Sequence, residues 1–86
     1  MIQINSTKAL GAAIRRARKQ LKLTQPELAL ASQVGVRFIV ELEAGKPTVR
    51  LASVMQVIDA LGGTLFLGGF PNSEHDKLSP SDQGQE

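Results

Sequence analysis

The stretch from Leu23 to Lys46, LTQPELALASQVGVRFIVELEAGK, constrains the fold more than any other part of the chain. Its pattern predicts two short helices separated by a tight turn. The first begins with a capping box, in which the Thr24 hydroxyl accepts from the Glu27 N–H and the Glu27 carboxylate accepts from the Thr24 N–H. Gly45 is typical of a helix C-terminus. Because isolated helices shorter than about 12–15 residues are marginal in water, this pair needs other helices to pack against.

The spacing of apolar residues predicts which side chains of these two helices are buried. In the first helix, Leu28, Ala29 and Ser32 share one face. In the second helix, Ile39 and Leu42 point inward. Four side chains remain on the other side of the second helix, and we expect them to point outward: Val36, Arg37, Val40 and Glu41.

The chain supplies one helix before this pair and one after it. The first is expected to start at an N-cap, Ser6 or Thr7, and to run to about Leu21, with apolar residues on one face and basic residues on the other. The second is expected over about 50–61 and ends at Gly62. Its apolar stripe is wider than one face of a small bundle can bury, which favours a second subunit over a wider core.

Residues 64–67, TLFL, are β-prone and have glycine on both sides. Because a single strand is not stable alone, this segment pairs either with residues 1–5 or with its own copy across a dimer axis. The dimer contacts expected from the last helix and this segment are Val57, Leu61, Leu65, Phe66 and Leu67. We therefore expect residues 1–70 to form one folded domain and residues 71–86, which are polar and acidic, to form a disordered tail.

The net charge of +2 conceals an asymmetry between the two parts of the chain. Residues 1–50 carry nine Lys and Arg against three acids, whereas residues 51–86 carry one Lys against five acids. A basic part beside an acidic one indicates a polyanion-binding domain with a solvated extension, and ordinary surface charge is the alternative explanation.

The residues that most enzymes and metal sites need are missing or isolated. The chain has no cysteine, and its one histidine, His75, lies in the polar tail without the spacing of a metal site. No phosphate loop, dinucleotide fingerprint or nucleophile elbow is present. We therefore expect neither a metal, nor a cofactor, nor catalysis. The chain also shows no signal peptide and no membrane-spanning run, which favours the cytoplasm.

The segment LGAAIRRARKQLKLTQPELALASQVGVRFIVELEAGK resembles the helix-turn-helix of the phage-repressor (Xre/Cro) family. The match covers residues 10–61, and it implies an all-α, compact domain of four or five helices with a short C-terminal strand that pairs across a dimer. The continuation, ELEAGKPTVRLASVMQVIDALGGTLFL, resembles a narrower group, the HipB-type antitoxins, which are partners of HipA-type serine/threonine kinase toxins.

This resemblance implies roles for particular residues. Gln25 matches a glutamine that bonds a phosphate and can brace a side chain of the recognition helix, which is here the second helix of the pair. Arg18 and Glu43 match a partly buried salt bridge between the first helix and the end of the recognition helix. The family usually has glycine at position 33 and a Ser-like cap at position 35, where this chain has Gln33 and Gly35. These departures leave the register of the recognition helix open by one residue.

A recognition helix enters the major groove of DNA with its N-terminal residues toward the bases. Arg37 is expected to read guanine, and Val36 and Val40 to contact thymine methyl groups. Glu41 either accepts from cytosine or orients Arg37. Gly35 begins the helix, and the phosphate contacts expected around it are Thr24, Gln25, Lys46 and Thr48.

These expectations describe a dimeric repressor of a palindromic operator on double-stranded DNA. The narrower resemblance adds a role as the antitoxin of a toxin–antitoxin system, which restrains a HipA-like kinase and represses its own operon. Two alternatives stay open. One is a stand-alone repressor of the same family without a toxin partner, and the other is a protein-interaction module that has lost DNA binding.

Overall fold

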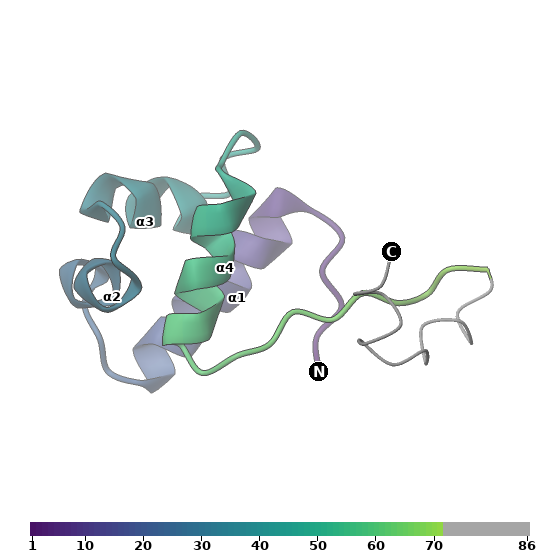
Figure 1. The fold of residues 1–86 in the computed structure, drawn as a ribbon, viewed down its shortest axis with the longest axis horizontal. Coiled ribbons are helices and arrows are strands. Elements are labelled where there is room, and N and C mark those ends of the chain that lie inside the picture. Colours follow the sequence, from purple (N-terminus) through teal and green to yellow (C-terminus); the bar gives the residue numbers. More distant parts are fainter. Residues whose placement is uncertain (72–86) are drawn as a thin grey trace, which may run out of the picture.

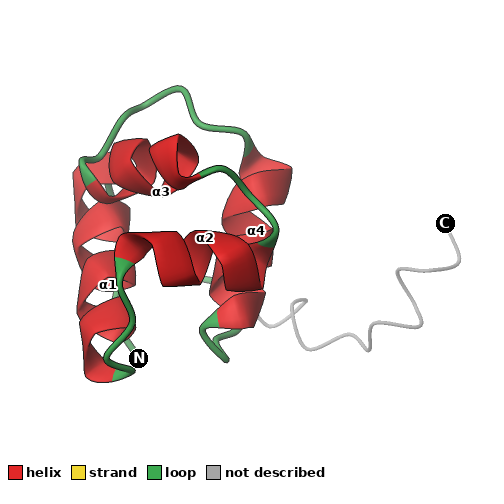
Figure 2. Ribbon diagram, turned by 90° about the vertical axis from the view of Figure 1, so that its left-hand side faces the viewer, coloured by secondary structure: helices red, strands yellow, loops and turns green. Residues whose placement is uncertain are grey.

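The computed structural model describes residues 1–71 of the chain. Four helices follow one another: α1 (Thr7–Gln20), α2 (Gln25–Ser32), α3 (Val36–Glu43) and α4 (Leu51–Ala60). α2 and α3 lie between α1 and α4 (Figure 2), and the chain after α4 leads away from the helices (Figure 1). The predicted all-α fold and the predicted order of helices are confirmed. Within residues 1–71, no helix is long and apolar enough to cross a membrane.

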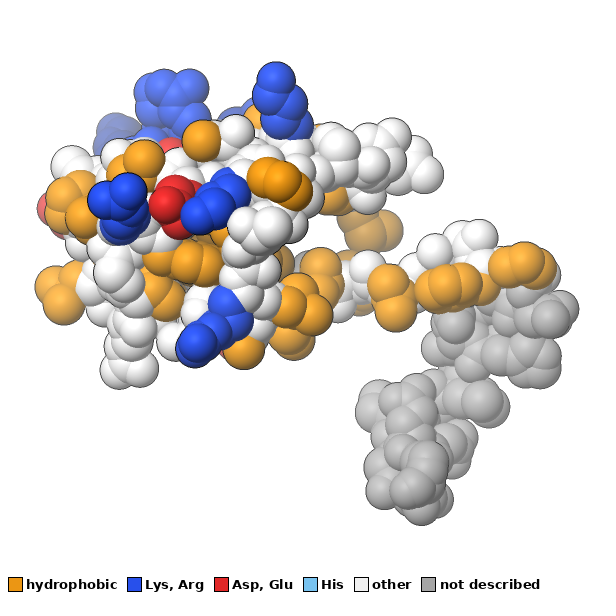
Figure 3. Space-filling view, turned by 90° about the horizontal axis from the view of Figure 1, so that it is seen from above, with side chains coloured by type: hydrophobic (Ala, Val, Ile, Leu, Met, Phe, Trp, Pro, Cys, Tyr) orange, Lys and Arg blue, Asp and Glu red, His pale blue; other side chains and the backbone are white. Residues whose placement is uncertain are grey.

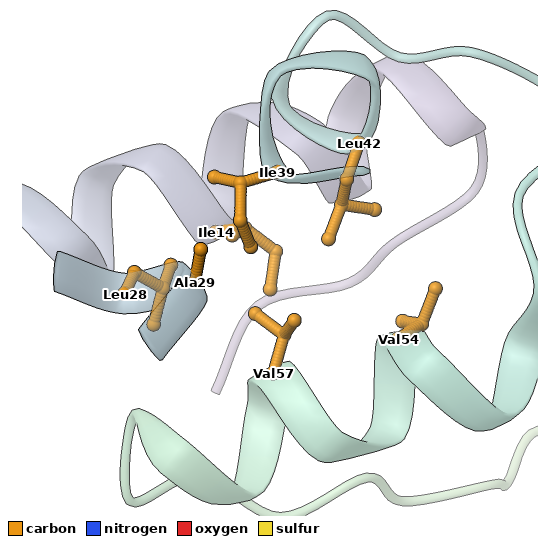
Figure 4. Packing of buried hydrophobic residues seen from close by; sticks show 7 residues of the cluster. All are labelled: Ile14, Leu28, Ala29, Ile39, Leu42, Val54 and Val57. Carbon is orange, nitrogen blue, oxygen red and sulfur yellow. The ribbon is translucent and has the colours of Figure 1, made fainter. Parts of the chain in front are cut away.

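All four helices contribute aliphatic side chains to one core (Figure 4). Leu28, Ile39 and Val57 have no exposed surface at all. Burying an aliphatic side chain of this size stabilises a fold by about 1.5–3 kcal/mol, so these contacts hold together helices too short to be stable alone. The seven core residues are Ile14, Leu28, Ala29, Ile39, Leu42, Val54 and Val57.

The predicted buried faces of α2 and α3 are confirmed, whereas one prediction for α4 is wrong. Val57 was expected at a dimer contact, but it lies in the core of the single chain. The reason is that α4 turns Val54 and Val57, three residues apart on one face, into the core that it shares with the other helices (Figure 4). Leu61 is half-buried against the same core, and Met55 remains exposed.

Each helix ends with a residue in the left-handed conformation. Gly45 (φ 86°) and Gly62 (φ 79°) serve after α3 and α4, and Lys22 (φ 60°) and Gln33 (φ 61°) serve after α1 and α2. At α2 the Val34 N–H then reaches back to the Ala29 carbonyl at 3.0 Å. Gln33 therefore keeps the turn that glycine usually makes, and α3 begins at Val36 with Gly35 as its N-cap.

The segment after α4 is exposed and apolar, but it forms no strand in the single chain. Residues 64–67 and residues 1–5 contain no β-structure, so pairing between these two segments in one chain is wrong. Leu65, Phe66, Leu67 and Phe70 are each more than half exposed. Pairing of residues 64–67 with a second copy stays a prediction. The predicted tail, apart from Pro71, lies outside the described residues.

Candidate nucleic-acid interface

α3 presents the four side chains that its sequence pattern points outward. Val36 and Val40 are 43% and 45% exposed, and the Arg37 side chain is 89% exposed. Glu41 is partly exposed one turn after Arg37. Figure 3 looks onto the side of the molecule that carries α3, and basic side chains gather there around a smaller acidic patch. This face combines one strong hydrogen-bond donor with two methyl-bearing side chains.

Two cations share the Glu41 carboxylate. Lys46 Nζ lies 3.3 Å from Oε1, and Arg37 Nε lies 3.4 Å from Oε2. The hydrogen bond from Lys46, followed by the weaker contribution of Arg37, holds the pKa of Glu41 below its ordinary value. The Lys46 N–H also donates to the Glu41 carbonyl at 3.1 Å. Lys46 was expected only at a phosphate, and its pairing with Glu41 was not predicted.

The end of α3 is fixed to α1 by a buried ion pair. Arg18 donates from Nε and Nη2 to the two oxygens of Glu43, at 2.6 and 2.9 Å, and from Nη1 to the Leu23 carbonyl at 2.8 Å. The two side chains are 9% and 4% exposed. The pair implied by the family resemblance is therefore present, and its two parallel bonds set the orientation of α3 as well as its distance from α1.

Gln25 completes this buried group. Its Nε2 donates to Glu43 Oε1 at 3.1 Å, so Gln25 braces the end of α3 from the start of α2. Burial by itself would raise the pKa of the Glu43 carboxyl, but the hydrogen bonds from Arg18 and Gln25 outweigh it and hold that pKa below its ordinary value. Glu43 is therefore ionised at neutral pH, and α1, α2 and α3 meet at its carboxylate.

Sequence reasoning missed Gly11, where α1 and α3 come closest. A Cβ at this position would lie 2.4 Å from the Leu42 carbonyl oxygen and 2.7 Å from that of Glu43. Only a residue without a side chain allows this approach. A signal was present, because glycine inside a helix costs about 1 kcal/mol relative to alanine, and a structural need has to offset that cost.

A second polar surface lies between the end of α1 and the start of α2. Arg15, Lys19 and Lys22 line a shallow hollow of about 700 Å³ together with Thr24 and Gln25. The predicted capping box is present, with the Glu27 N–H donating to the Thr24 hydroxyl at 3.1 Å and the Thr24 N–H donating to Glu27 at 2.8 Å. The Thr24 hydroxyl keeps its own hydrogen to donate to an anion.

The other predicted phosphate residues, Lys46 and Thr48, are both exposed in the loop between α3 and α4. His75 lies outside the described residues. In residues 1–71, no three His, Cys, Asp or Glu side chains come together as metal ligands would.

Four helices, with the buried Arg18–Glu43 pair on the inner side of α3 and exposed side chains on its outer side, define a DNA-binding helix-turn-helix domain. The profile of the helix-turn-helix family HTH_3 matches residues 14–67, and the chain belongs to this family. The sequence resemblance to Xre-type proteins is thereby confirmed. Proteins of this kind regulate transcription and are not enzymes.

The relatives agree with this assignment. The chain is 48% identical over 60 residues to the uncharacterized HTH-type transcriptional regulator y4mF of Sinorhizobium fredii. The aligned residues make up 70% of this chain and 79% of that protein. Two solved structures have the same fold: a HipB–O4 20mer complex (TM-score 0.75) and a HipA–HipB–O2–O3 complex (TM-score 0.74). The matched HipB-complex chain is 23% identical in each case, and the superposition covers 80% of this chain and 97% of the matched chain.

Proposed function

We propose that this DNA-binding regulator is a repressor that recognises a specific palindromic operator as a homodimer and inserts α3 into the major groove. The observation that carries the proposal is the exposed face of α3, on which Arg37 stands between Val36 and Val40. An arginine grips guanine O6 and N7 for about 1–3 kcal/mol of discrimination, and valine methyl groups suit the thymine methyl.

The phosphate contacts proposed around α3 come from the start of α2, the loop after α3 and the start of α3 itself. Thr24 and Gln25 line the basic hollow at the end of α1. Lys46 and Thr48 are exposed in the loop after α3, and the start of α3 at Gly35 supplies backbone N–H groups that favour an anion. Such contacts fix the position of α3 on the duplex without reading its sequence.

The test of this reading is Arg37→Ala against Lys46→Ala. We expect Arg37→Ala to lose preference for one base pair, while the slope of log affinity against log salt concentration falls by at most about one. Lys46→Ala is expected to weaken binding to all duplexes alike and to reduce the salt slope by about one. Uniform weakening by Arg37→Ala would place Arg37 on a phosphate and shift the register of α3.

The proposed dimer is formed by the end of α4 and the segment after it. Leu61 is half-buried, and Leu65, Phe66 and Leu67 are each more than half exposed, so they form a run of apolar side chains of the kind that marks a protein–protein contact. Pairing of residues 64–67 with a second copy would place the two α3 helices about 34–36 Å apart, one turn of DNA. A monomer at micromolar concentration in analytical ultracentrifugation would contradict this dimer.

The proposal extends to a partner protein. The likeness to HipB in complexes with DNA and with HipA supports a role as a cytoplasmic antitoxin. In that role the chain binds a HipA-like serine/threonine kinase, and the complex represses its own operon. Co-purification of the tagged chain with the product of the neighbouring gene tests this, and a stoichiometric complex with a kinase-like protein is the expected result.

A second candidate is a stand-alone repressor. It is favoured by the relative at 48% identity, whose name is that of an HTH-type transcriptional regulator. The DNA and dimer contacts are the same in both candidates. If no protein co-purifies while the chain still binds its own upstream DNA, the chain is a stand-alone repressor and the antitoxin proposal fails.

A further inference from the structure

The acidic residue Glu41 lies on the surface that faces DNA in the proposed function. Glu41 belongs to the same outward face of α3 as Arg37, Val36 and Val40. Its side chain is 32% exposed, so the charge is open to solvent. A carboxylate at this place repels the phosphates of every duplex, whatever its sequence. The position therefore needs an explanation that ordinary phosphate binding does not give.

The geometry of the Arg37–Glu41 contact supplies one. Within residues 1–71, Glu41 accepts a hydrogen bond from Nε of Arg37 and from neither terminal nitrogen of that side chain. Arg37 consequently keeps both of its terminal NH₂ groups for another ligand. Guanine is read by two parallel donors of arginine on O6 and N7, and the terminal groups form such a fork.

Lys46 keeps Glu41 in this position. Its ammonium group holds Oε1 at 3.3 Å while Oε2 faces Arg37, and its backbone N–H bonds the Glu41 carbonyl. The carboxylate is thus held from the loop side and aimed along α3 at Arg37. A phosphate that engages Lys46 would weaken this hold only on one oxygen, and the contact with Arg37 would remain.

We propose that Glu41 sets the base selectivity of this regulator by orienting the terminal groups of Arg37 toward guanine, while its charge lowers the affinity for every duplex. The inference rests on the proposed function, in which α3 reads the major groove. Where Arg37 meets guanine, the contact offsets the repulsion of the carboxylate. Elsewhere the repulsion remains, and binding is weak. Glu41 is a positioning residue, because it acts through Arg37.

The experiment starts with selection of the full chain on a randomised 20-base-pair duplex pool, which yields a preferred duplex and a variant with its guanine replaced. The ratio of the two affinities is then measured for the unchanged chain, Glu41→Gln and Glu41→Ala. Glutamine keeps an acceptor for Arg37 but removes the charge, and alanine removes both. Asp59→Asn, which removes the same charge from α4, is the matched control.

We expect a ratio of about tenfold or more for the unchanged chain and for Asp59→Asn. Glu41→Gln should bind both duplexes several-fold more tightly, an effect that shrinks with added salt because the lost repulsion is screened, and it should keep most of the ratio because glutamine still accepts from Arg37. Glu41→Ala, which removes the acceptor as well, should reduce the ratio by at least about threefold. In the Arg37→Ala background, Glu41→Ala should leave the ratio unchanged, because the two residues act together.

Two results overturn the inference. One is a ratio that changes by less than about twofold in both Glu41 variants while circular dichroism shows them folded. The other is a loss of selectivity that persists in the Arg37→Ala background, since Glu41 would then read a base itself. If the unchanged chain enriches no sequence and binds no duplex, the proposed function fails together with the inference, which distinguishes that case from the other two.

Discussion

The Arg18–Glu43 and Arg37–Glu41 pairs bring the same two functional groups together at opposite sides of α3. The first joins two helices, is almost fully buried and uses two parallel bonds of 2.6 and 2.9 Å. The second lies within one helix, is exposed and uses one bond of 3.4 Å. Burial makes the first pair indispensable once formed, whereas exposure leaves the second free to exchange partners. The domain thus holds α3 from behind and leaves its front adaptable.

The largest expected effect is that of Arg18→Ala. Removing Arg18 leaves the Glu43 carboxylate buried without its main partner and the Leu23 carbonyl without its donor. Loss of one member of a buried pair costs about 3–5 kcal/mol. We expect urea unfolding to show a drop in the free energy of unfolding of that size. A loss below about 1 kcal/mol would mean that the buried pair is no stronger than a surface pair.

Gly11→Ala tests the same junction through packing. Helix propensity alone predicts a gain of about 1 kcal/mol from alanine. The methyl group would, however, meet two backbone carbonyl oxygens of α3, which cannot move as a side chain can. We expect a net loss of about 1–3 kcal/mol in thermal or urea unfolding, as in other overpacked sites. A stabilised Gly11→Ala would show that α1 and α3 separate without cost.

The two carboxylates should also differ in their response to pH. The folded state lowers the pKa of Glu43, so its contribution is complete above the unfolded value of about 4.3 and is lost as the pH falls through the folded value. We expect the free energy of unfolding to fall from about pH 5 downward, and Glu43→Gln to flatten that slope. Glu41→Gln should flatten it less, and only at low salt, because exposed charges are screened. Equal flattening by both variants would contradict the comparison.

Arg37→Ala should have the smallest effect on stability. Exposed pairs of this spacing contribute about 0.3–0.5 kcal/mol, and the order with arginine before glutamate is the less favourable one. We expect the free energy of unfolding to change by less than about 0.5 kcal/mol, measured under the conditions used for Arg18→Ala. Its effect on DNA selectivity should be large by comparison. A stability loss near that of Arg18→Ala would make Arg37 a structural residue.

The local features of this domain could be predicted from the sequence because neighbours along the chain determine them. Helical spacing placed Leu28 and Ile39 in the core, and the capping box at Thr24 is present as predicted. Approaches between distant segments were harder to predict. Nothing in local spacing indicates that Gly11 touches the end of α3 or that Lys46 turns back to Glu41.

Val57 illustrates the same limit. A helix with a wide apolar stripe has more than one apolar side that could point inward, and spacing alone does not select between them. The choice depends on where α2 lies, which is a property of the assembled domain. The Arg18–Glu43 pair, 25 residues apart, was predictable only through the family resemblance.

Gln33 has a consequence for how such a regulator changes over generations. The turn before α3 keeps its shape with glutamine in the left-handed conformation, so the backbone geometry does not depend on glycine at that position. A lineage can alter residue 33 at a modest cost in stability without moving the helix that follows. New binding preferences can therefore evolve through substitutions along α3 while the turn keeps the same backbone conformation.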